Sequence, residues 1–411
     1  MPFPLYVLAL AVFAMGTSEF MLAGLLPDIA SGLGVGVGVA GALTSAYAIG
    51  MVVGAPLMAA LARRWPARSS LLGCVLVFAA AHALGAVTES FTVLCATRVV
   101  AAFANAGFLA VALATATTLV PADRKGRALA VLLSGTTVAT IAGVPGGSAL
   151  GALLGWRATF WAVAVLCLPA ALGILILIGV PARLPIGHPQ TVSEHPGSGH
   201  SGSGHPVIGR PVTGHPPLRA ELAQLKRPRL LLVMLLGALV NAATFASLTF
   251  LAPVVTGTAG LDALWVPVAL VLFGAGSFVG VTVAGRLADR RPGLVVAVGG
   301  PLLLAGWPAL ALLADRPVAL LTLVCVQATL SFALGGTLIT RVLYEAADAP
   351  AMSGSYATAA LNLGATAGPL LAATTLHSRA AELGPLWAST LLVAAALLIA
   401  LPARAVLAGR S

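Results

Sequence analysis

The stretch "GHPQTVSEHPGSGHSGSGHP" (187–206) divides the chain into two parts of similar length. It is rich in Gly, Ser, Pro and His and has no apolar periodicity, so it cannot bury a hydrophobic core. Polar and turn-forming residues dominate the wider segment 181–228, which we therefore predict to be a disordered linker. Its histidines are loosely spaced and lack cysteine or carboxylate partners, so we expect no metal site there.

Long apolar runs fill the chain on both sides of this linker. Of the 411 residues, 59% are hydrophobic and 8% are charged, whereas soluble domains are about 25% charged. A run of about twenty apolar residues is long enough to cross a bilayer as a helix. We count six such runs before the linker and six after it: 4–26, 41–62, 71–88, 91–119, 128–154, 159–180, 230–254, 265–286, 294–314, 317–340, 354–376 and 386–403. The sequence thus predicts an all-α, multi-pass membrane protein with two six-helix bundles, 1–180 and 229–411.

The positive charge lies mainly on one side of the predicted membrane. The formal net charge is +10, which by itself could suggest nucleic-acid binding. With the termini and the linker on one side, eighteen Lys and Arg residues fall on that side. The other side receives only Arg157, Arg316 and Arg379. This bias predicts cytoplasmic termini and a cytoplasmic linker in a plasma-membrane protein, and it gives no reason to expect nucleic acid.

The two halves repeat each other in sequence. Gly50 and Gly54 match Gly276 and Gly280, both at an offset of 226 residues. A duplicated six-span unit is the architecture of the major facilitator fold, whose substrate site lies near the membrane midplane between the halves. We therefore expect this fold, with its two pseudo-symmetric bundles.

Two charged residues lie deep within predicted spans. Glu19, in "MGTSEF" (15–20), has about ten apolar residues on either side, a position that costs roughly 3 kcal/mol on insertion scales. A buried carboxylate resists ionisation, so it can hold a proton in one state and release it in another. Arg98 needs a partner or a water-lined cavity, unless it snorkels to the nearby outer surface. Glu19 and Arg98 are our candidates for proton coupling; the alternative is a structural Glu19, held permanently by hydroxyl or Arg partners.

Two loops resemble the conserved loop motif of major facilitators, G-x-L-A-D-R-x-G-R. In that family the aspartate caps a neighbouring helix and the arginines pair across the two halves, which latches one conformation. "GRLADRRPG" (285–293) retains the aspartate, Asp289, whereas "AALARRWPARS" (59–69) has Arg63 in its place. The resemblance predicts a cytoplasmic latch, and the alternative is charge that only sets topology. The latch residues would be Arg64, Arg68, Asp289 and Arg290.

The fifth predicted span carries a stripe of small residues. Gly135, Ala139, Gly143, Gly147 and Gly151 recur every four residues, which lets a neighbouring helix approach closely. Within this span a proline removes an internal hydrogen bond and bends the helix. The run G-V-P-G-G resembles the signature of the drug–proton antiporter branch, although packing alone also accounts for the glycines. Its motif residues are Gly143, Pro145, Gly146 and Gly147.

Longer stretches resemble the actinomycete chloramphenicol-resistance exporters. They are "MPFPLYVLALAVFAMGTSEFMLAGLLPDIASGL" (1–33), "LLSGTTVATIAGVPGG" (132–147), "GALVNAATFASLTFLAPVV" (237–255) and "LITRVLYEAA" (338–347). The resemblance implies proton-coupled efflux of chloramphenicol or related drugs. A neutral amphiphile needs an apolar cavity with a few hydrogen-bonding groups. Candidates to line it, or alternatively to join helices by hydrogen bonds, are Tyr47, Asn105, Asn241, Phe245, Gln327 and Asn362.

Other functions fit the sequence less well. A facilitator that exports a sugar or an endogenous metabolite is the main alternative, but sugar sites are richer in polar and aromatic side chains. A membrane enzyme or an ATP-driven pump would need a nucleophile–base pair, a metal-spaced cluster or a Walker A loop, and no loop carries one. A receptor that does not transport would have no use for Glu19. We therefore expect a monomeric transporter without a cofactor, whose partners are the drug, protons and the bilayer.

Overall fold

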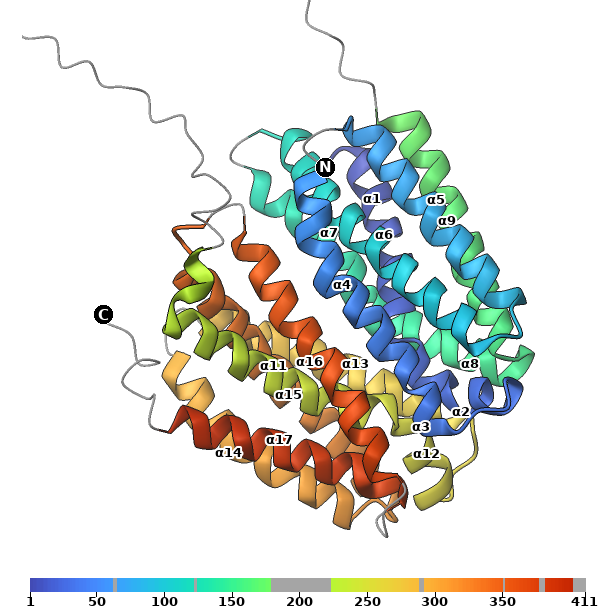
Figure 1. Ribbon diagram of the computed structural model, residues 1–411, viewed down its shortest axis with the longest axis vertical. Helices are drawn as coiled ribbons and strands as arrows, with labels where there is room; N and C mark the ends of the chain where they lie inside the picture. Colours follow the sequence, from blue (N-terminus) through green and yellow to red (C-terminus); the bar gives the residue numbers. More distant parts are fainter. Residues whose placement is uncertain are drawn as a thin grey trace, which may run out of the picture.

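The computed structural model describes residues 1–61, 65–121, 124–178, 223–287, 292–349, 352–376 and 381–401 (Figure 1). Within these ranges the regular structure is helical, without a β-strand. Most of the predicted linker 181–228 and parts of both latch loops lie outside the described residues. This helical architecture confirms the predicted all-α class.

Six membrane crossings make up the first half. The first crossing is α1 followed by α2, and the second is the short α3 followed by α4. In the fifth crossing, a π-helical segment (Ala139–Gly143) joins α7 to α8. The helices are α1 (Phe3–Phe20), α2 (Leu22–Gly32), α3 (Val37–Ala40), α4 (Ala42–Leu61), α5 (Ala67–Val87), α6 (Phe91–Thr118), α7 (Lys125–Val138), α8 (Val144–Leu154) and α9 (Trp156–Leu177).

The second half contains six further crossings, of which the first is α11 followed by α12. Its helices are α11 (Pro228–Thr249), α12 (Leu251–Pro253), α13 (Trp265–Leu287), α14 (Pro292–Leu312), α15 (Pro317–Glu345), α16 (Ser353–Thr375) and α17 (Gly384–Ala400). Among the described residues, ten helices are long and apolar enough to span a membrane. The other two crossings are α17, which is apolar but 17 residues long, and α16, which is 23 residues long but richer in polar residues.

The repeat seen in sequence is also a repeat of contacts. A Cβ atom added at Gly50 would meet Val99 and Ala102, so α4 lies close against α6. A Cβ at Gly276 would meet Cys325 and Ala328, which joins α13 to α15 in the same way. Each of these three residues in the second half follows its counterpart by 226 positions, since 276 − 50, 325 − 99 and 328 − 102 all equal 226. The two halves therefore pack these helices with one shared geometry.

Contacts between the halves concentrate toward one face of the molecule. We name the face that contains the start of α1 and the ends of α9 and α17 the linker face, and the other the opposite face. Figure 1 places α2, α3 and α12 together near the opposite face, and α2 contacts α12 there. Further from that face, toward the middle of the molecule, the ring centroids of Phe20 and Phe245 lie 5.6 Å apart. The Ser45 hydroxyl donates a hydrogen bond to the Thr366 carbonyl at 2.8 Å. These contacts join the two halves from the opposite face down to the level of the Phe20 and Phe245 rings.

Candidate functional site

A chain of buried hydrogen bonds crosses the core of the first half. Arg98 on α6 is 1% exposed, and its two terminal nitrogens donate to Ser18 on α1. Nη1 lies 2.7 Å from the Ser18 hydroxyl, and Nη2 lies 2.9 Å from the Ser18 carbonyl oxygen. The same hydroxyl lies 2.6 Å from Nε2 of His82 on α5, which is also buried. Three helices are thus joined by polar side chains where the bilayer would offer no water.

A buried imidazole close to the Arg98 guanidinium is neutral, and this leaves one proton arrangement for the chain. His82 Nδ1 lies 2.8 Å from the carbonyl oxygen of Phe78, which can only accept, so Nδ1 carries the hydrogen. Nε2 of the neutral ring then accepts from the Ser18 hydroxyl, and that hydroxyl in turn accepts from Arg98. The Phe78 ring, whose centroid is 4.3 Å from that of His82, helps to fix the imidazole. The hydrogen bonds therefore all run in one direction, from Arg98 to Ser18, and from Ser18 to His82. They orient the guanidinium.

Glu19 lies directly after Ser18 on α1, at the edge of this cluster. Its side chain is half-buried, and it interacts electrostatically with both Arg98 and Tyr47. The Arg98 guanidinium also covers the Tyr47 ring, with its carbon 4.4 Å from the ring centroid. Nε of Arg98 has no hydrogen-bond partner among the described residues. Glu19 and Arg98, the two residues predicted from sequence for proton coupling, therefore lie close enough to interact electrostatically. A proton on Glu19 changes the electric field at Arg98.

Tyr47 and Asn105 extend the polar cluster along α4 and α6. The Asn105 amide donates to the Tyr47 hydroxyl at 2.8 Å, and both side chains are 2% exposed. Because Tyr47 also stacks under Arg98, this pair is linked to the charged site. Both residues are among the predicted cavity residues, and Tyr47 also interacts electrostatically with Glu19.

The other predicted cavity residues are placed differently. Phe245 packs against Phe20, Ala48 and Ala365, so it lies where the halves meet. Asn241 donates to the Leu361 carbonyl at 2.7 Å, which ties α11 to α16.

Gln327 and Asn362 make their hydrogen bonds within the second half. The Gln327 amide donates to the Leu303 carbonyl at 3.1 Å, between α15 and α14. Asn362 donates to Thr358, one turn earlier on its own helix. Asn241 and Gln327 therefore have the helix-joining contacts that were the alternative interpretation of these residues.

The small-residue stripe packs against α1 and, further along, against α9. A Cβ atom at Gly143 would collide with the Thr17 hydroxyl, and one at Gly147 would lie 3.1 Å from Thr159. Gly146 has nothing within 4 Å of its added Cβ. The predicted bend is realised as the π-helical turn that immediately precedes α8, because Pro145 has no N–H with which to continue the α-helical pattern. Two of the three motif glycines are thus needed for close packing.

Of the predicted latch, only Arg68 belongs to the described residues. Its guanidinium donates to the Leu175 carbonyl at the end of α9, within the first half. Arg64, Asp289 and Arg290 lie outside the described residues, so the latch stays a prediction.

Sequence reasoning missed His82 and Ser18. A signal for His82 was available, since it is an ionisable residue inside an apolar run, like Glu19 and Arg98. Ser18 gave no such signal, because a serine in a span ordinarily bonds to its own helix. Its role depends on which side chains the fold brings to it.

The chain resembles a known protein family and known transport and resistance proteins over most of its length. The sequence profile described as "Major Facilitator Superfamily" matches residues 8–369. The chain is 72% identical over 407 residues to the "Chloramphenicol resistance protein" of Streptomyces lividans, covering 99% of this chain and 97% of that protein. It is 32% identical over 362 residues to the "Inner membrane transport protein YdhP" of Escherichia coli (strain K12), covering 88% and 86%.

Solved structures agree on the fold. A bacterial homologue of the human lysosomal transporter Spinster, in an inward-facing and unoccupied conformation, superposes with a TM-score of 0.73. The alignment covers 97% of this chain and 95% of that one at 17% identity, which supports the architecture alone.

Proposed function

The chain belongs to the Major Facilitator Superfamily, and from that membership we propose that it exports chloramphenicol or a related amphiphilic drug in exchange for protons. As a member of a transporter family it moves its substrate across a membrane and is not an enzyme. The observation that supports this substrate assignment is the 72% identity, over nearly the whole chain, to a chloramphenicol resistance protein. Drug efflux at the plasma membrane accounts for such resistance.

In this proposal the linker face is cytoplasmic. The support is the excess of Lys and Arg on that side, which follows the positive-inside rule. The contacts that close the opposite face then correspond to an inward-facing state, ready to take a drug from the cytoplasm or the inner leaflet. An exporter must visit this state in every cycle.

Glu19 is the proposed coupling carboxylate. It takes up a proton when the site is open to the outside and releases it to the cytoplasm, while the drug favours the deprotonated, inward-facing form. Moving one charge through 100 mV supplies about 2.3 kcal/mol, which drives the cycle. Arg98 stabilises the deprotonated carboxylate through the field they share, and the Ser18–His82 chain keeps the guanidinium oriented.

Proton release by purified protein tests this assignment. Glu19→Gln keeps the size and hydrogen-bonding capacity of the side chain but cannot titrate. We expect the wild type to release protons when chloramphenicol is added in weakly buffered solution, and the variant to release none. In energised cells the variant should lose uphill efflux, and so should the wild type treated with a protonophore.

Glu89→Gln is the matched control, because Glu89 is exposed at the opposite-face end of α5. It should release protons and pump like the wild type. If Glu19→Gln still releases protons and still pumps against a gradient, Glu19 is structural and coupling occurs elsewhere. If neither protein binds chloramphenicol, the substrate assignment is wrong.

A further inference from the structure

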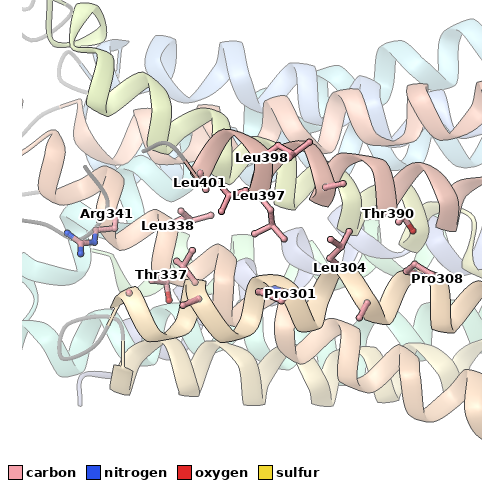
Figure 2. Close-up of a pocket in the computed structure, with 16 residues that line it drawn as sticks. Pro301, Leu304, Pro308, Thr337, Leu338, Arg341, Thr390, Leu397, Leu398 and Leu401 are labelled. Atoms are coloured by element: carbon pink, nitrogen blue, oxygen red, sulfur yellow. The ribbon is translucent and has the colours of Figure 1, made fainter. Parts of the chain in front are cut away.

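A large cavity lies in the second half, away from the charged cluster. It has a volume of about 1020 Å³ and is bounded by α14, α15 and α17. Figure 2 shows side chains from α14 and α17 facing each other across it, with Thr337, Leu338 and Arg341 of α15 at one end. None of the residues that we assign to proton coupling or to the drug cavity lines it.

The cavity is a groove that runs along the membrane normal. On α14 its lining extends from Gly293 near the linker face to Pro308, at helical spacing along one side. The 15 residues between them (308 − 293) span about 22 Å at 1.5 Å per residue. Half of a hydrocarbon core is about 15 Å thick. The groove therefore begins at the linker-side surface and reaches past the depth of one leaflet.

The groove is apolar along its length and basic at its linker-face end. Leucine side chains such as Leu304 and Leu397 line its middle, and Figure 2 places Arg341 at one end, with Pro308 and Thr390 at the other. Arg341 is half-buried, and no hydrogen bond or ion pair joins it to another residue in the described part of the chain. Glu345, one turn further along α15, makes no ion pair with it either.

We propose that this groove binds an anionic phospholipid of the linker-side leaflet, with an acyl chain between α14 and α17 and the phosphate on Arg341. A guanidinium matches a phosphate with two parallel hydrogen bonds, which supplies the partner that Arg341 lacks among the described residues. Basic pockets between membrane helices on the cytoplasmic side bind such headgroups. The acyl chain fills apolar volume that opens to the bilayer and would otherwise be empty.

Charge argues against two other occupants. The segment 402–411, which follows α17 in the sequence, carries Arg404 and Arg410 and no acidic side chain that could pair with Arg341. A neutral drug would gain little from a guanidinium. The lipid proposal does not depend on chloramphenicol as the substrate, so it can fail or succeed independently of the proposed function.

Lipid retention by the purified full-length chain tests the site. Native mass spectrometry would follow added phosphatidylglycerol, with zwitterionic phosphatidylcholine as the comparison. We expect the wild type to retain phosphatidylglycerol preferentially and Arg341→Gln to bind it about five- to ten-fold more weakly, as one lost charge contact implies. Arg229→Gln removes an exposed positive charge from the same face and should leave binding unchanged.

A second pair of variants tests the acyl-chain part of the groove. Ala305 lines the groove, so Ala305→Phe should fill it and lower retention several-fold. Leu302 lies on α14 outside the lining and is 53% exposed, so Leu302→Phe should retain lipid like the wild type. A phosphatidylglycerol with a photoreactive acyl chain should crosslink to α14 or α17.

Three outcomes would overturn the proposal. Equal retention by wild type and Arg341→Gln would exclude a phosphate on Arg341. A several-fold gain of lipid on deletion of 402–411 would identify that segment as the native occupant. Displacement of the lipid by chloramphenicol, together with loss of drug binding in Ala305→Phe, would make the groove a drug site.

Discussion

Arg98 illustrates how one residue can be held at membrane depth without a direct ion pair. Its guanidinium donates twice to Ser18, stacks on Tyr47 and interacts with Glu19 through the field. With both terminal nitrogens bound to Ser18 and the guanidinium over the Tyr47 ring, the side chain has little freedom to turn. The most indirect of its supports is His82, which acts only through the Ser18 hydroxyl. That makes His82 a positioning residue, with a testable chemical requirement.

We expect His82→Leu to slow drug efflux and His82→Gln to preserve most of it. The leucine removes the acceptor for the Ser18 hydroxyl, and a buried unsatisfied hydroxyl costs about 1–3 kcal/mol. If this penalty falls on the active arrangement, the rate drops by about five-fold to 160-fold. The glutamine carbonyl can replace Nε2 as acceptor. Initial efflux rates at equal membrane abundance measure the effect. Equal rates for the two variants would show that the acceptor does not matter.

The charged residues of the site were predictable because charge is rare in an apolar span. Glu19 and Arg98 could be singled out for that reason, and their proximity follows from the fold. The neutral members were not predictable to the same degree. Polar side chains in spans form either cavities or helix–helix contacts, and only the packing of α11 against α16 assigns Asn241 to the second group.

At the scale of elements, the fifth crossing depends on its glycines more than on its proline. A Cβ atom at Gly135 would fall on the Ala9 carbonyl and the Phe13 amide of α1, which are backbone atoms that cannot rotate away. The four-residue spacing in the sequence predicted this close approach. The π-helical turn at Ala139–Gly143 was not predictable, because a proline bends a helix without specifying how the preceding turn adjusts.

Gly135→Ala should therefore destabilise the protein, whereas Gly126→Ala should not. Overpacking at a close helix contact costs about 1–3 kcal/mol. Gly126 is on the same helix with nothing within 4 Å of its added Cβ, so alanine there should be neutral or slightly stabilising. Thermal unfolding of the two purified variants in one detergent compares them. A wild-type melting temperature for Gly135→Ala would mean that α1 and α7 can separate without cost.

At the scale of the whole molecule, the two halves with six crossings each were predictable from hydropathy alone. The conformation was not, since an alternating-access protein uses one sequence for more than one arrangement of its halves. Contacts such as those between Phe20 and Phe245 distinguish the arrangement with the opposite face closed. Which face points to the cytoplasm depends on the distribution of arginine and lysine.

Cysteine labelling in intact cells checks that orientation. With the four native cysteines replaced, Ser201→Cys in the linker should resist an impermeant reagent added outside and react once the cells are permeabilised. Asp262→Cys, at an exposed position on the opposite face, should react in both cases. Reaction at position 201 in intact cells would reverse the predicted topology.

The duplicated contacts carry one last consequence. A Cβ atom added at Gly364 would fall on the backbone of Ala238 and Ala242, just as one at Gly135 would fall on that of Ala9 and Phe13. Each residue of the second set follows its counterpart in the first half by 229 positions (364 − 135, 238 − 9, 242 − 13). With the offset of 229, the position in the second half that corresponds to Glu19 is Leu248. With the offset of 226, the position that corresponds to Arg98 is Val324. The two bundles thus share a packing pattern, but at these two matched positions only the first has charged residues. Under the coupling that we propose, protonation of Glu19 acts within the first bundle, and the second bundle takes part through its packing against the first.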